Sequence, residues 1–221
     1  MKIIISGYGK MGHMVEKSVL RRGLELVEAT EDVCATDPSV AKECVCIDFT
    51  TPDAFRTNYK FLARNFKAVV VGTTGWDDIA EEVTGAFEAA GTTMIHSSNY
   101  SIGVNAVFAA LEKVSSILKG NGYKPAIEET HHIHKLDAPS GTAKTMASLV
   151  ADNLGIKPDI TSYREGEVPG THIVEFESGV DKIRISHEAF SREGFAEGAV
   201  LAATMTEGLE GVYTFKELLL K

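Results

Sequence analysis

The sequence predicts an α/β protein, with a doubly wound parallel sheet followed by a second, smaller α+β domain. Two observations predict this fold class. Between residues 2 and 101, short apolar segments rich in β-branched residues alternate with helical patterns. Beyond residue 169, two segments of alternating polarity replace that pattern, which indicates an antiparallel pair of strands.

The first βα unit contains a glycine-rich turn. An apolar strand is predicted over Lys2 to Ser6, followed by Gly7-Tyr8-Gly9-Lys10-Met11-Gly12 and by a helix that runs from Met11 to near Gly23. In a Gly-x-Gly-x-x-Gly turn the first glycine permits a tight turn, the second lets the backbone approach a pyrophosphate, and the third lets helix and strand pack closely. The helix N-terminus then faces the phosphates.

A second strand, Leu24 to Ala29, ends at Glu31-Asp32, where an acid can bind a ribose diol. A glycine turn in an unrelated α/β domain remains the alternative. Here, however, strand, helix, second strand and acid occur in the order of a Rossmann-type dinucleotide site. We therefore predict cofactor contacts from Gly7, Tyr8, Gly9, Lys10, Met11, Gly12, Glu31 and Asp32.

The parallel sheet is expected to continue. We predict strands at Cys44 to Phe49, Ala68 to Val71 and Thr92 to His96, with helices from Pro52 towards Ala63 and from Trp76 to Ala90. Small polar loops follow the three strands, where ligands of such folds bind. Each loop alone is compatible with a plain turn, but together they indicate a cofactor edge. The contacts expected there are Gly72, Thr73, Thr74, Ser97, Ser98, Asn99 and Tyr100.

The second half mixes helices with strands. We predict a helix over Gly103 to Leu118, a strand over Lys124 to Thr130, a loop over Thr161 to Val168, and antiparallel strands over Gly170 to Phe176 and Lys182 to His187. A last helix opens in the segment from Ser191 to Ala196 and is expected to pack back on the first domain.

A histidine-rich loop is the most distinctive stretch of the chain. Three of the seven histidines lie within residues 131–134, followed by Lys135 and by Pro-Ser-Gly-Thr at 139–142. Apolar residues at 143, 146, 147 and 150 have helical spacing, so Ser140 or Gly141 is expected to cap a helix. A helix N-terminus beside lysine and histidine suits a small carboxylate or phosphate, and histidine can deliver a proton near neutral pH.

Two alternatives apply to this loop. His132 and His134 share one face of a strand and could bind a metal, and the stretch could also be a structural polar turn. No carboxylate or cysteine is well placed as a further ligand, and Lys135 would repel a cation. We therefore expect a catalytic or anion-binding loop without a metal.

Composition restricts the possible partners. The 221 residues carry a formal net charge of −9, without any basic run, which does not favour nucleic acid or an anionic membrane as a partner. The cysteines Cys34, Cys44 and Cys46 are odd in number, and we expect them to be unpaired in a reducing cytosol. Because neither a signal peptide nor a membrane-spanning apolar run is evident, we expect a cytoplasmic protein.

The segment from His131 to Ala143 resembles the signature of the 4-hydroxy-tetrahydrodipicolinate reductase family, also called the dihydrodipicolinate reductase family. Residues 72–75, 98–105 and 192–199 resemble further blocks of that family in the same order. The glycine loop departs from the family's Gly-x-x-Gly-Arg-Met-Gly, because it is one residue shorter and has Lys10. The segment from Glu31 to Val45 is also short, so the chain resembles the compact members.

The resemblance implies an oxidoreductase of the diaminopimelate and lysine biosynthesis pathway. Such an enzyme reduces 4-hydroxy-tetrahydrodipicolinate to tetrahydrodipicolinate with NADH or NADPH. By the resemblance, His131 is the proton donor and Lys135 a catalytic donor. The substrate is a small dicarboxylate, and the residues implied to hold its carboxylates are His132, Ser140, Gly141, Thr142 and Arg192.

The resemblance also implies a homotetramer built through the sheet of the second domain. We accordingly expect a dinucleotide-binding domain of residues 1–101 and 193–221, and a substrate-binding and oligomerisation domain of residues 102–192.

At the end of the second strand, Glu31-Asp32 is followed by no lysine or arginine until Lys42, which predicts a preference for NADH over NADPH.

Two other functions remain open at this point. An aldehyde-oxidising dehydrogenase could share the two-domain plan but would need a cysteine nucleophile in the second domain, and no cysteine follows Cys46. A non-catalytic nucleotide sensor would not need Lys135 and the Pro-Ser-Gly-Thr sequence beside the histidines.

Overall fold

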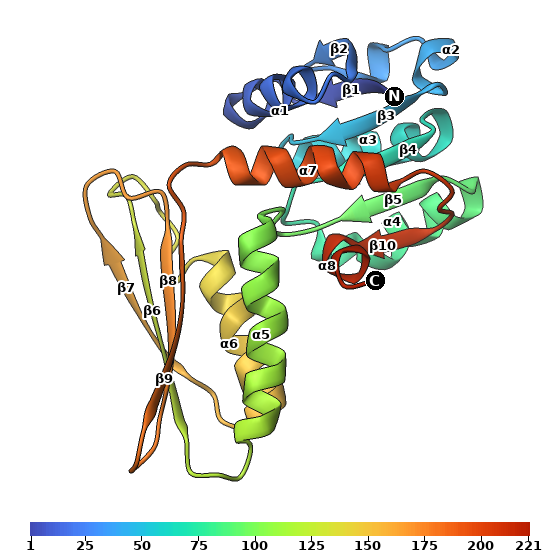
Figure 1. Cartoon of the computed structure of the whole chain (residues 1–221). Helices are drawn as coiled ribbons and strands as arrows, with labels where there is room; N and C mark the ends of the chain where they lie inside the picture. The colour runs from blue at the N-terminus through green and yellow to red at the C-terminus, as the bar shows by residue number, and fades with distance from the viewer. The chain divides into compact units, whose positions relative to one another are not determined.

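The computed structural model describes residues 1–221 and divides into two compact units. Unit 1 consists of Met1–Ser101 and Glu193–Lys221, and unit 2 of Ile102–Arg192 (Figure 1). The predicted α/β class with a second, mixed domain is therefore confirmed.

Unit 1 is built on a six-stranded parallel sheet with the strand order β10-β5-β4-β3-β1-β2. Its elements in chain order are β1 (Lys2–Ser6), α1 (Lys10–Arg21), β2 (Glu25–Thr30), the 3-10 turn η1 (Val33–Ala35), α2 (Pro38–Ala41), β3 (Cys44–Asp48), α3 (Pro52–Asn65), β4 (Ala68–Val71), the 3-10 turn η2 (Asp77–Ile79), α4 (Ala80–Ala90), β5 (Thr93–His96), α7 (Glu193–Met205), β10 (Val212–Thr214) and α8 (Phe215–Leu219).

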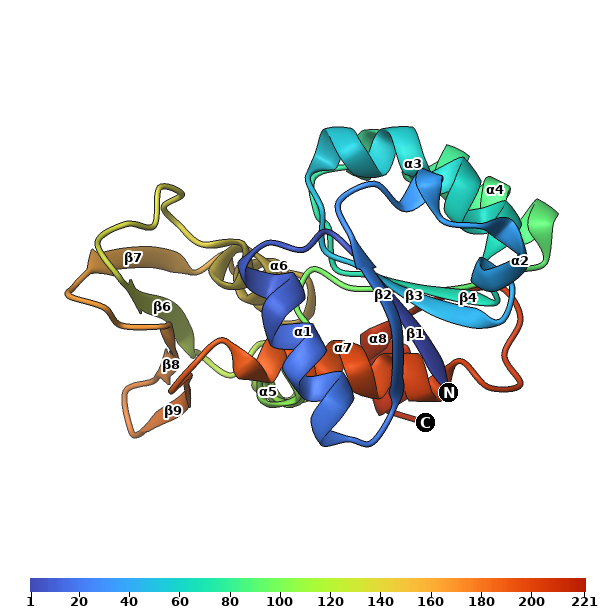
Figure 2. The same ribbon diagram turned by 90° about the horizontal axis from the view of Figure 1, so that it is seen from above.

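Helices cover both faces of this sheet. Figure 2 shows α3 and α4 on one face and α1 with α7 on the other. Strand β1 is apolar throughout because both of its faces are buried. Ile3 and Ile5 pack into the layer that contains Val15, whereas Ile4 packs into the layer that contains Phe55. Burial on both faces is typical of parallel sheets and explains the uninterrupted apolar strands of the sequence.

The last long helix returns to unit 1, as the sequence predicted. Helix α7 packs beside α1, and a Cβ atom added at Gly198 would lie only 1.7 Å from the carbonyl oxygen of Tyr100. A glycine is therefore required where the α7 backbone meets the loop after β5, because any side chain there would separate the two.

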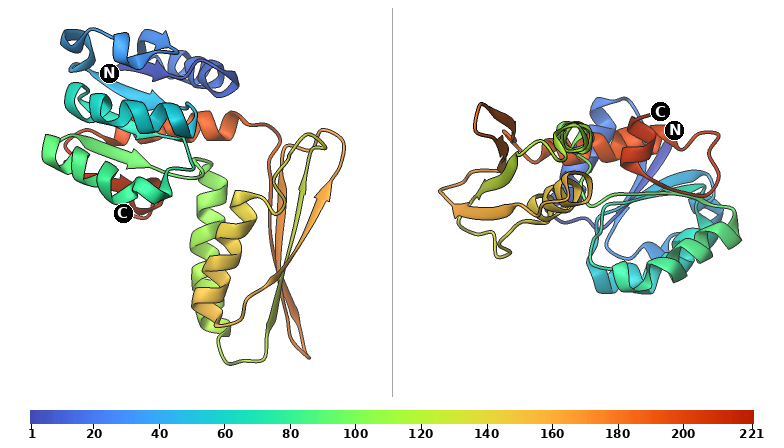
Figure 3. Two further views of the ribbon diagram at one scale, coloured as in Figure 1. Left: turned by 180° about the vertical axis from the view of Figure 1, so that it is seen from behind. Right: turned by 90° about the horizontal axis from the view of Figure 1, so that it is seen from below.

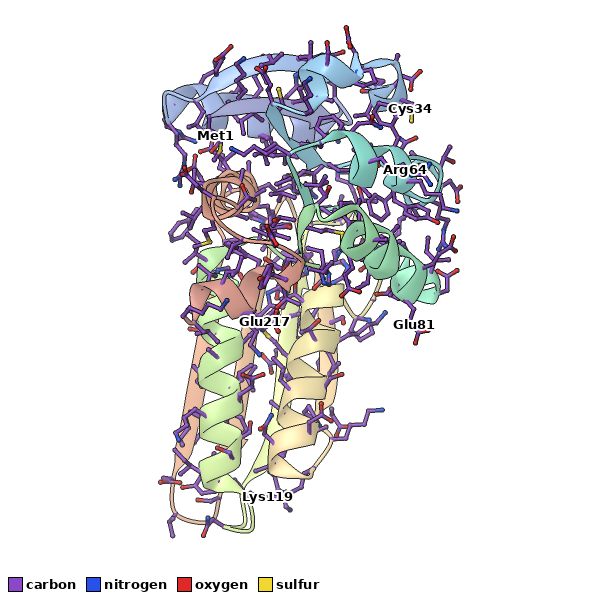
Figure 4. The ribbon with its side chains drawn as sticks, turned by 90° about the vertical axis from the view of Figure 1, so that its right-hand side faces the viewer. Met1, Cys34, Arg64, Glu81, Lys119 and Glu217 are labelled. Atoms are coloured by element: carbon purple, nitrogen blue, oxygen red, sulfur yellow. The ribbon has the colours of Figure 1, made fainter.

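Unit 2 is a four-stranded mixed sheet with the order β7-β6-β8-β9. Its elements are α5 (Ile102–Leu118), β6 (Lys124–His131), α6 (Gly141–Leu154), β7 (Asp159–Arg164), β8 (Thr171–Glu177) and β9 (Lys182–Glu188). Strands β6 and β7 are parallel, and the other pairs are antiparallel. Helices α5 and α6 lie side by side over one face of this sheet (Figures 3 and 4), and Lys119 marks the end of α5 in Figure 4.

The sequence prediction was wrong in one segment of unit 2. Residues 161–168 were expected to form a loop, whereas Asp159–Arg164 forms the edge strand β7. This strand buries only alternate positions and places Ser162 and Arg164 on its inner face, so its sequence lacks the apolar alternation that predicts a strand. The helix expected from Trp76 also begins later, because a 3-10 turn precedes α4.

The sequence analysis missed the C-terminal elements. Strand β10 adds to the edge of the parallel sheet beside β5, and α8 follows it with a capping box made by Thr214 and Glu217. The three cysteines are unpaired, with Cys44 and Cys46 buried in β3. None of the helices combines the length and hydropathy that crossing a bilayer requires.

A buried carboxylate joins three strand ends of unit 1. The Asp48 side chain, at the end of β3, accepts hydrogen bonds from Ser6 Oγ at 2.7 Å and Thr73 Oγ1 at 2.6 Å. The Thr50 hydroxyl donates to the same carboxylate at 3.2 Å. Burial raises the pKa of Asp48 even though these hydroxyl donors act to lower it. Asp48 thereby fixes the loops after β1, β3 and β4 at one edge of the sheet.

We predict that Asp48→Ala lowers the free energy of unfolding by roughly 2–4 kcal/mol, because the buried hydroxyls of Ser6 and Thr73 and the half-buried hydroxyl of Thr50 lose their shared acceptor. Asp48→Asn, which retains one side-chain oxygen, is expected to lose less. Glu43→Ala provides the control, since Glu43 pairs with Lys2 on the surface and should change stability far less. Denaturant unfolding measures all three, and an Asp48→Ala protein as stable as the parent would contradict the role assigned to this carboxylate.

Candidate active site

The glycine loop between β1 and α1 has the geometry that its sequence predicts. Gly7 has φ +88°, and a Cβ atom added there would lie 2.3 Å from the carbonyl oxygen of Phe49. At Gly12 an added Cβ would lie 2.2 Å from the carbonyl oxygen of Gly7, so the third glycine permits the close packing of helix on loop. At Gly9 an added Cβ would meet nothing within 4 Å, which leaves one face of the backbone open to a ligand.

The N-terminus of α1 differs from those of two other helices. The N-cap of α3 is Thr51 and that of α6 is Ser140, and each accepts a hydrogen bond from the first turn of its helix. The N-cap of α1 is Gly9, which offers no side-chain acceptor. The first-turn N–H groups of α1 therefore suit the oxygens of a phosphate, which would complete their hydrogen bonding.

The two acids after β2 have different surroundings. Glu31 Oε1 accepts a hydrogen bond of 2.9 Å from the backbone N–H of Tyr8, so this carboxylate lies against the glycine loop. Asp32 instead accepts from the backbone N–H of Cys34 at 3.2 Å and caps the turn η1. The sequence could not distinguish the two, and the structure places Glu31 nearer to the predicted phosphate cradle.

Two of the predicted cofactor residues direct their side chains inwards. The Tyr100 ring is buried, and its hydroxyl lies 3.0 Å from the carbonyl oxygen of Val71 and 2.9 Å from that of Ile95. The Thr73 hydroxyl is bound to Asp48. The side chains of Tyr100 and Thr73 thus hold the strand ends together. A cofactor at this edge would contact the backbone groups of these two residues and not their side chains.

In unit 2, β6 delivers a carboxylate and a histidine to the helix-covered face of its sheet. Glu129 is 1% exposed, and its Oε1 accepts from Arg164 Nη2 at 3.0 Å. Its Oε2 contacts Nδ1 of His131, two residues further along the same strand. Burial acts to raise the pKa of Glu129, but hydrogen bonds and the positive partners outweigh it, and the pKa lies below its ordinary value.

The other edge of the His131 ring faces the start of β8. A Cβ atom added at Gly170, where φ is +153°, would lie 3.0 Å from His131 Nε2. A side chain at Gly170 would therefore crowd this nitrogen. Burial lowers the pKa of His131, and the Glu129 carboxylate works in the opposite direction.

A second buried histidine adjoins the first. The rings of His131 and His172 meet edge to face with centroids 5.1 Å apart. His172 Nε2 lies 3.1 Å from Ser140 Oγ, and the same hydroxyl accepts from the backbone N–H of Ala143 as the N-cap of α6. Burial lowers the pKa of His172 to about 4, so this ring is neutral near pH 7.

The remaining predicted groups lie on the loop between β6 and α6 and on the segment after β9. Lys135 Nζ pairs with Asp137 Oδ1 at 2.8 Å, and Arg192 Nη2 lies 2.8 Å from His132 Nε2. Arg164 Nη2 donates to the carbonyl oxygen of Asp137 at 2.6 Å and so anchors the loop to β7.

The structure thus brings the predicted residues together in unit 2. His132 and Arg192 form one pair, and Ser140 begins the helix on which Gly141 and Thr142 supply first-turn N–H groups. His134 is exposed and pairs with Glu167 at 3.1 Å, and its ring centroid lies 6.0 Å from that of His132.

Sequence reasoning missed three residues of the site, Glu129, Arg164 and His172. Glu129 could have been found, because residues two apart on a strand share a face and Glu129 precedes His131 by two. Arg164 and His172 lie on other strands, and only the pairing register brings them beside Glu129.

A metal would fit this cluster poorly. Glu129, His131 and His172 offer ligand atoms within 4.8 Å of one another, a different set from the His132 and His134 considered from sequence. However, one Glu129 oxygen is held by the Arg164 guanidinium, and the other by His131. The nearby cations would repel a further positive ion.

Comparison with known proteins identifies relatives over the whole chain. The family model described as dihydrodipicolinate reductase, N-terminus, matches residues 1–100, and the model for the C-terminus matches residues 103–219. A 4-hydroxy-tetrahydrodipicolinate reductase of Christiangramia forsetii is 37% identical over 233 aligned positions, covering 99% of this chain and 98% of the relative. One of Akkermansia muciniphila is 34% identical, with coverage of 99% and 98%.

A solved structure shares the fold. It is the dipicolinate-bound dihydrodipicolinate reductase from Paenisporosarcina sp. TG-14, with a TM-score of 0.77, 22% identity and 99% coverage of both chains.

We predict that the purified protein lacks stoichiometric zinc and that its catalytic turnover survives exhaustive chelation, because Arg164 and His131 already occupy the Glu129 carboxylate. Elemental analysis and activity before and after chelation measure this. Loss of turnover on chelation, with recovery on adding zinc, would instead establish the Glu129, His131 and His172 cluster as a metal site.

Proposed function

The chain belongs to the dihydrodipicolinate reductase family, and we propose on that basis that it reduces 4-hydroxy-tetrahydrodipicolinate to tetrahydrodipicolinate in the diaminopimelate and lysine pathway. The observation that carries this proposal is the match of both family models, which together span residues 1–100 and 103–219. The full-length relatives with this activity in their names support it. The three unpaired cysteines are compatible with a cytoplasmic enzyme.

The coenzyme of this family is NAD(P)H, which supplies a hydride when it is bound. In unit 1 the residues fit a dinucleotide. Gly9 leaves open space, the N-terminal turn of α1 has no side-chain cap, and Gly7 and Gly12 give the loop the shape of a phosphate cradle. The Glu31 carboxylate, which lies against this loop, is suited to the adenosine ribose hydroxyls.

The substrate is a dicarboxylate, and unit 2 offers a matching set of donors. Ser140 begins α6, whose first turn includes the N–H groups of Gly141 and Thr142. Lys135 and the His132–Arg192 pair supply positive charge on the preceding loop and on the segment after β9. Charged donors and helix N-termini are both strong carboxylate binders, so we assign the two carboxylates to these groups.

Proton delivery is assigned to His131, with Lys135 as a second donor. Hydride addition leaves negative charge on the substrate, and a protonated side chain held beside it would neutralise that charge. His131 is 8% exposed, which keeps bulk water from competing at the ring, and Lys135 is near enough for its charge to lower the pKa of His131.

We further propose a homotetramer that forms through the sheet of unit 2. Helices α5 and α6 cover one face of this sheet, whereas the opposite face presents Tyr163, Ile173 and Arg184. Tyr163 is 48% exposed, as expected for a side chain that a second sheet could cover. Sedimentation equilibrium gives the mass of the assembly, and a monomer at micromolar concentration would refute this part of the proposal.

We predict that His131→Ala and Lys135→Ala each lower kcat by roughly 10²–10⁴-fold, the range for the loss of a general acid. His134→Ala is the matched control, because His134 lies on the same loop but pairs with Glu167 in solvent, and it should have a much smaller effect. Steady-state kinetics at 340 nm with the natural substrate measure all three. Near-normal turnover by Lys135→Ala would remove that residue from the catalytic set.

We predict a moderate preference for NADH, so that kcat/KM measured with NADH is higher than kcat/KM measured with NADPH. Glu31 and Asp32 would repel the 2′-phosphate of NADPH, although Lys10 partly offsets them across the loop. Asp32→Arg should shift the ratio of the two kcat/KM values towards NADPH on the order of tenfold, equivalent to about 1.4 kcal/mol from one arginine–phosphate contact.

The control for this experiment is Glu25→Arg, which places the same charge at the opposite end of β2. It should leave the coenzyme ratio unchanged. A parent enzyme that clearly prefers NADPH, together with an Asp32→Arg variant of unaltered ratio, would show that these acids do not face the ribose.

A further inference from the structure

We propose that Glu129 is a positioning residue that fixes the orientation of the His131 ring and favours its imidazolium form, whose Nε2 proton is the one transferred to the substrate. This inference rests on the proposed role of His131 and adds to it a residue that the sequence analysis did not identify. It is carried by the burial of Glu129, by its contact with His131 Nδ1, and by the open position of the opposite nitrogen beside Gly170.

The geometry determines which nitrogen gives up its proton. An ionised carboxylate can only accept hydrogen bonds, so Nδ1 of His131 must be the protonated nitrogen that donates to Glu129. The Nδ1 proton is consequently retained, and the transferable proton is on Nε2. That nitrogen lies next to Gly170, where the absence of a side chain leaves room for an approaching group.

Glu129 is itself fixed on its other side. Its second oxygen accepts from Arg164 at 3.0 Å, and the Ser162 hydroxyl together with this ion pair favours the ionised carboxylate although the side chain is fully shielded from solvent. A carboxylate that is held ionised stabilises an imidazolium next to it, as in other carboxylate–histidine pairs. Arg164 therefore acts through Glu129, and it contacts the loop at the carbonyl oxygen of Asp137 as well.

The proton transfer balances without a further reactant. The Nε2–H bond of the imidazolium breaks, its electron pair remains on the ring, and a new bond to hydrogen forms at the substrate atom that carries negative charge after hydride addition. His131 ends as a neutral imidazole that still donates Nδ1–H to Glu129. Solvent then restores the proton on Nε2 before the next turnover.

Four titratable residues face the His131 ring, and three of them are charged near pH 7. Glu129 on the same strand favours the imidazolium, whereas Lys135 on the following loop and Arg164 on β7 disfavour it. His172 on β8 is neutral near pH 7 because burial lowers its pKa to about 4. Glu129 is thus the group in this set that opposes burial and the two cations.

The test compares Glu129→Gln and Glu129→Asp with the parent enzyme. We expect Glu129→Gln to lower kcat by roughly 10²–10⁴-fold with little change in KM, because the variant keeps the side-chain volume and loses the charge. The basic limb of its kcat–pH profile should move to lower pH. Glu129→Asp retains a carboxylate and should recover most of the lost kcat.

The matched control is Glu128→Gln. Glu128 is the neighbouring residue on β6, but it is exposed and points to the opposite face of the sheet, so this variant should match the parent in kcat and pH profile. Arg164→Ala provides the comparison for a structural effect, because it releases the Asp137 loop and should raise KM. A Glu129→Gln variant that raises KM without moving the pH profile would assign Glu129 to loop anchoring and overturn the proposal.

A readout independent of activity separates this inference from the function itself. NMR titration of the His131 ring, identified by its absence in His131→Ala, reports the pKa directly in the whole protein. The pKa should fall in Glu129→Gln and stay near the parental value in Glu129→Asp and Glu128→Gln. An unchanged pKa in Glu129→Gln would refute the positioning role even if the enzyme reduces its substrate. Failure to reduce the substrate, with the pKa shift present, would refute only the proposed function.

Discussion

The buried Asp48 carboxylate is the constraint on which the cofactor edge of unit 1 depends. Its hydrogen bonds reach Ser6 at the end of β1 and Thr73 after β4, and the Thr50 backbone N–H donates in turn to the Thr73 hydroxyl at 2.7 Å. Burying a carboxylate is costly unless it is hydrogen-bonded, so these hydroxyls are required and not incidental. Because three strand ends share one acceptor, none of the loops can move without breaking a buried hydrogen bond. The same edge places Gly7 where its missing side chain lets the backbone approach Phe49.

The two units each bury one carboxylate, and the surroundings decide how each behaves. Around Asp48 the donors are neutral hydroxyls, burial dominates, and the pKa rises. Around Glu129 burial acts in the same direction, but the Ser162 hydroxyl, Arg164 and His131 together outweigh burial and the pKa falls. Positive charge near a carboxyl group favours its ionised form, and Glu129 has such partners whereas Asp48 has neutral donors alone. A carboxylate among hydroxyls suits a structural role, whereas one kept ionised beside a histidine suits an electrostatic role.

The parts of the protein that could be predicted from sequence are those encoded by neighbouring residues. Strand β1, the glycine loop and α1 follow from local spacing, and the structure gives Gly7 and Gly12 the steric reason that the motif implies. The parts that could not be predicted depend on residues far apart in the chain. Strand β7 has no apolar alternation and is a strand because β6 pairs with it. His172 and Arg164 belong to the site only through the register that places them opposite Glu129 and beside His131.

The same distinction between local and distant effects explains how a protein of net charge −9 can offer a site for an anion. Exposed charges more than about 8 Å away are largely screened at physiological ionic strength, so the overall excess of acids acts weakly on a bound carboxylate. The groups on the loop and at the helix start act at contact distance. Lys135 lies on the loop that leads to α6, Arg192 contacts His132 on the same loop, and the N–H groups of α6 add the positive end of its dipole. Glu129 adds a negative charge nearby, but its two oxygens are held by His131 and by the Arg164 guanidinium. It is therefore not the ion-pair partner of Lys135, which contacts Asp137 on its own loop.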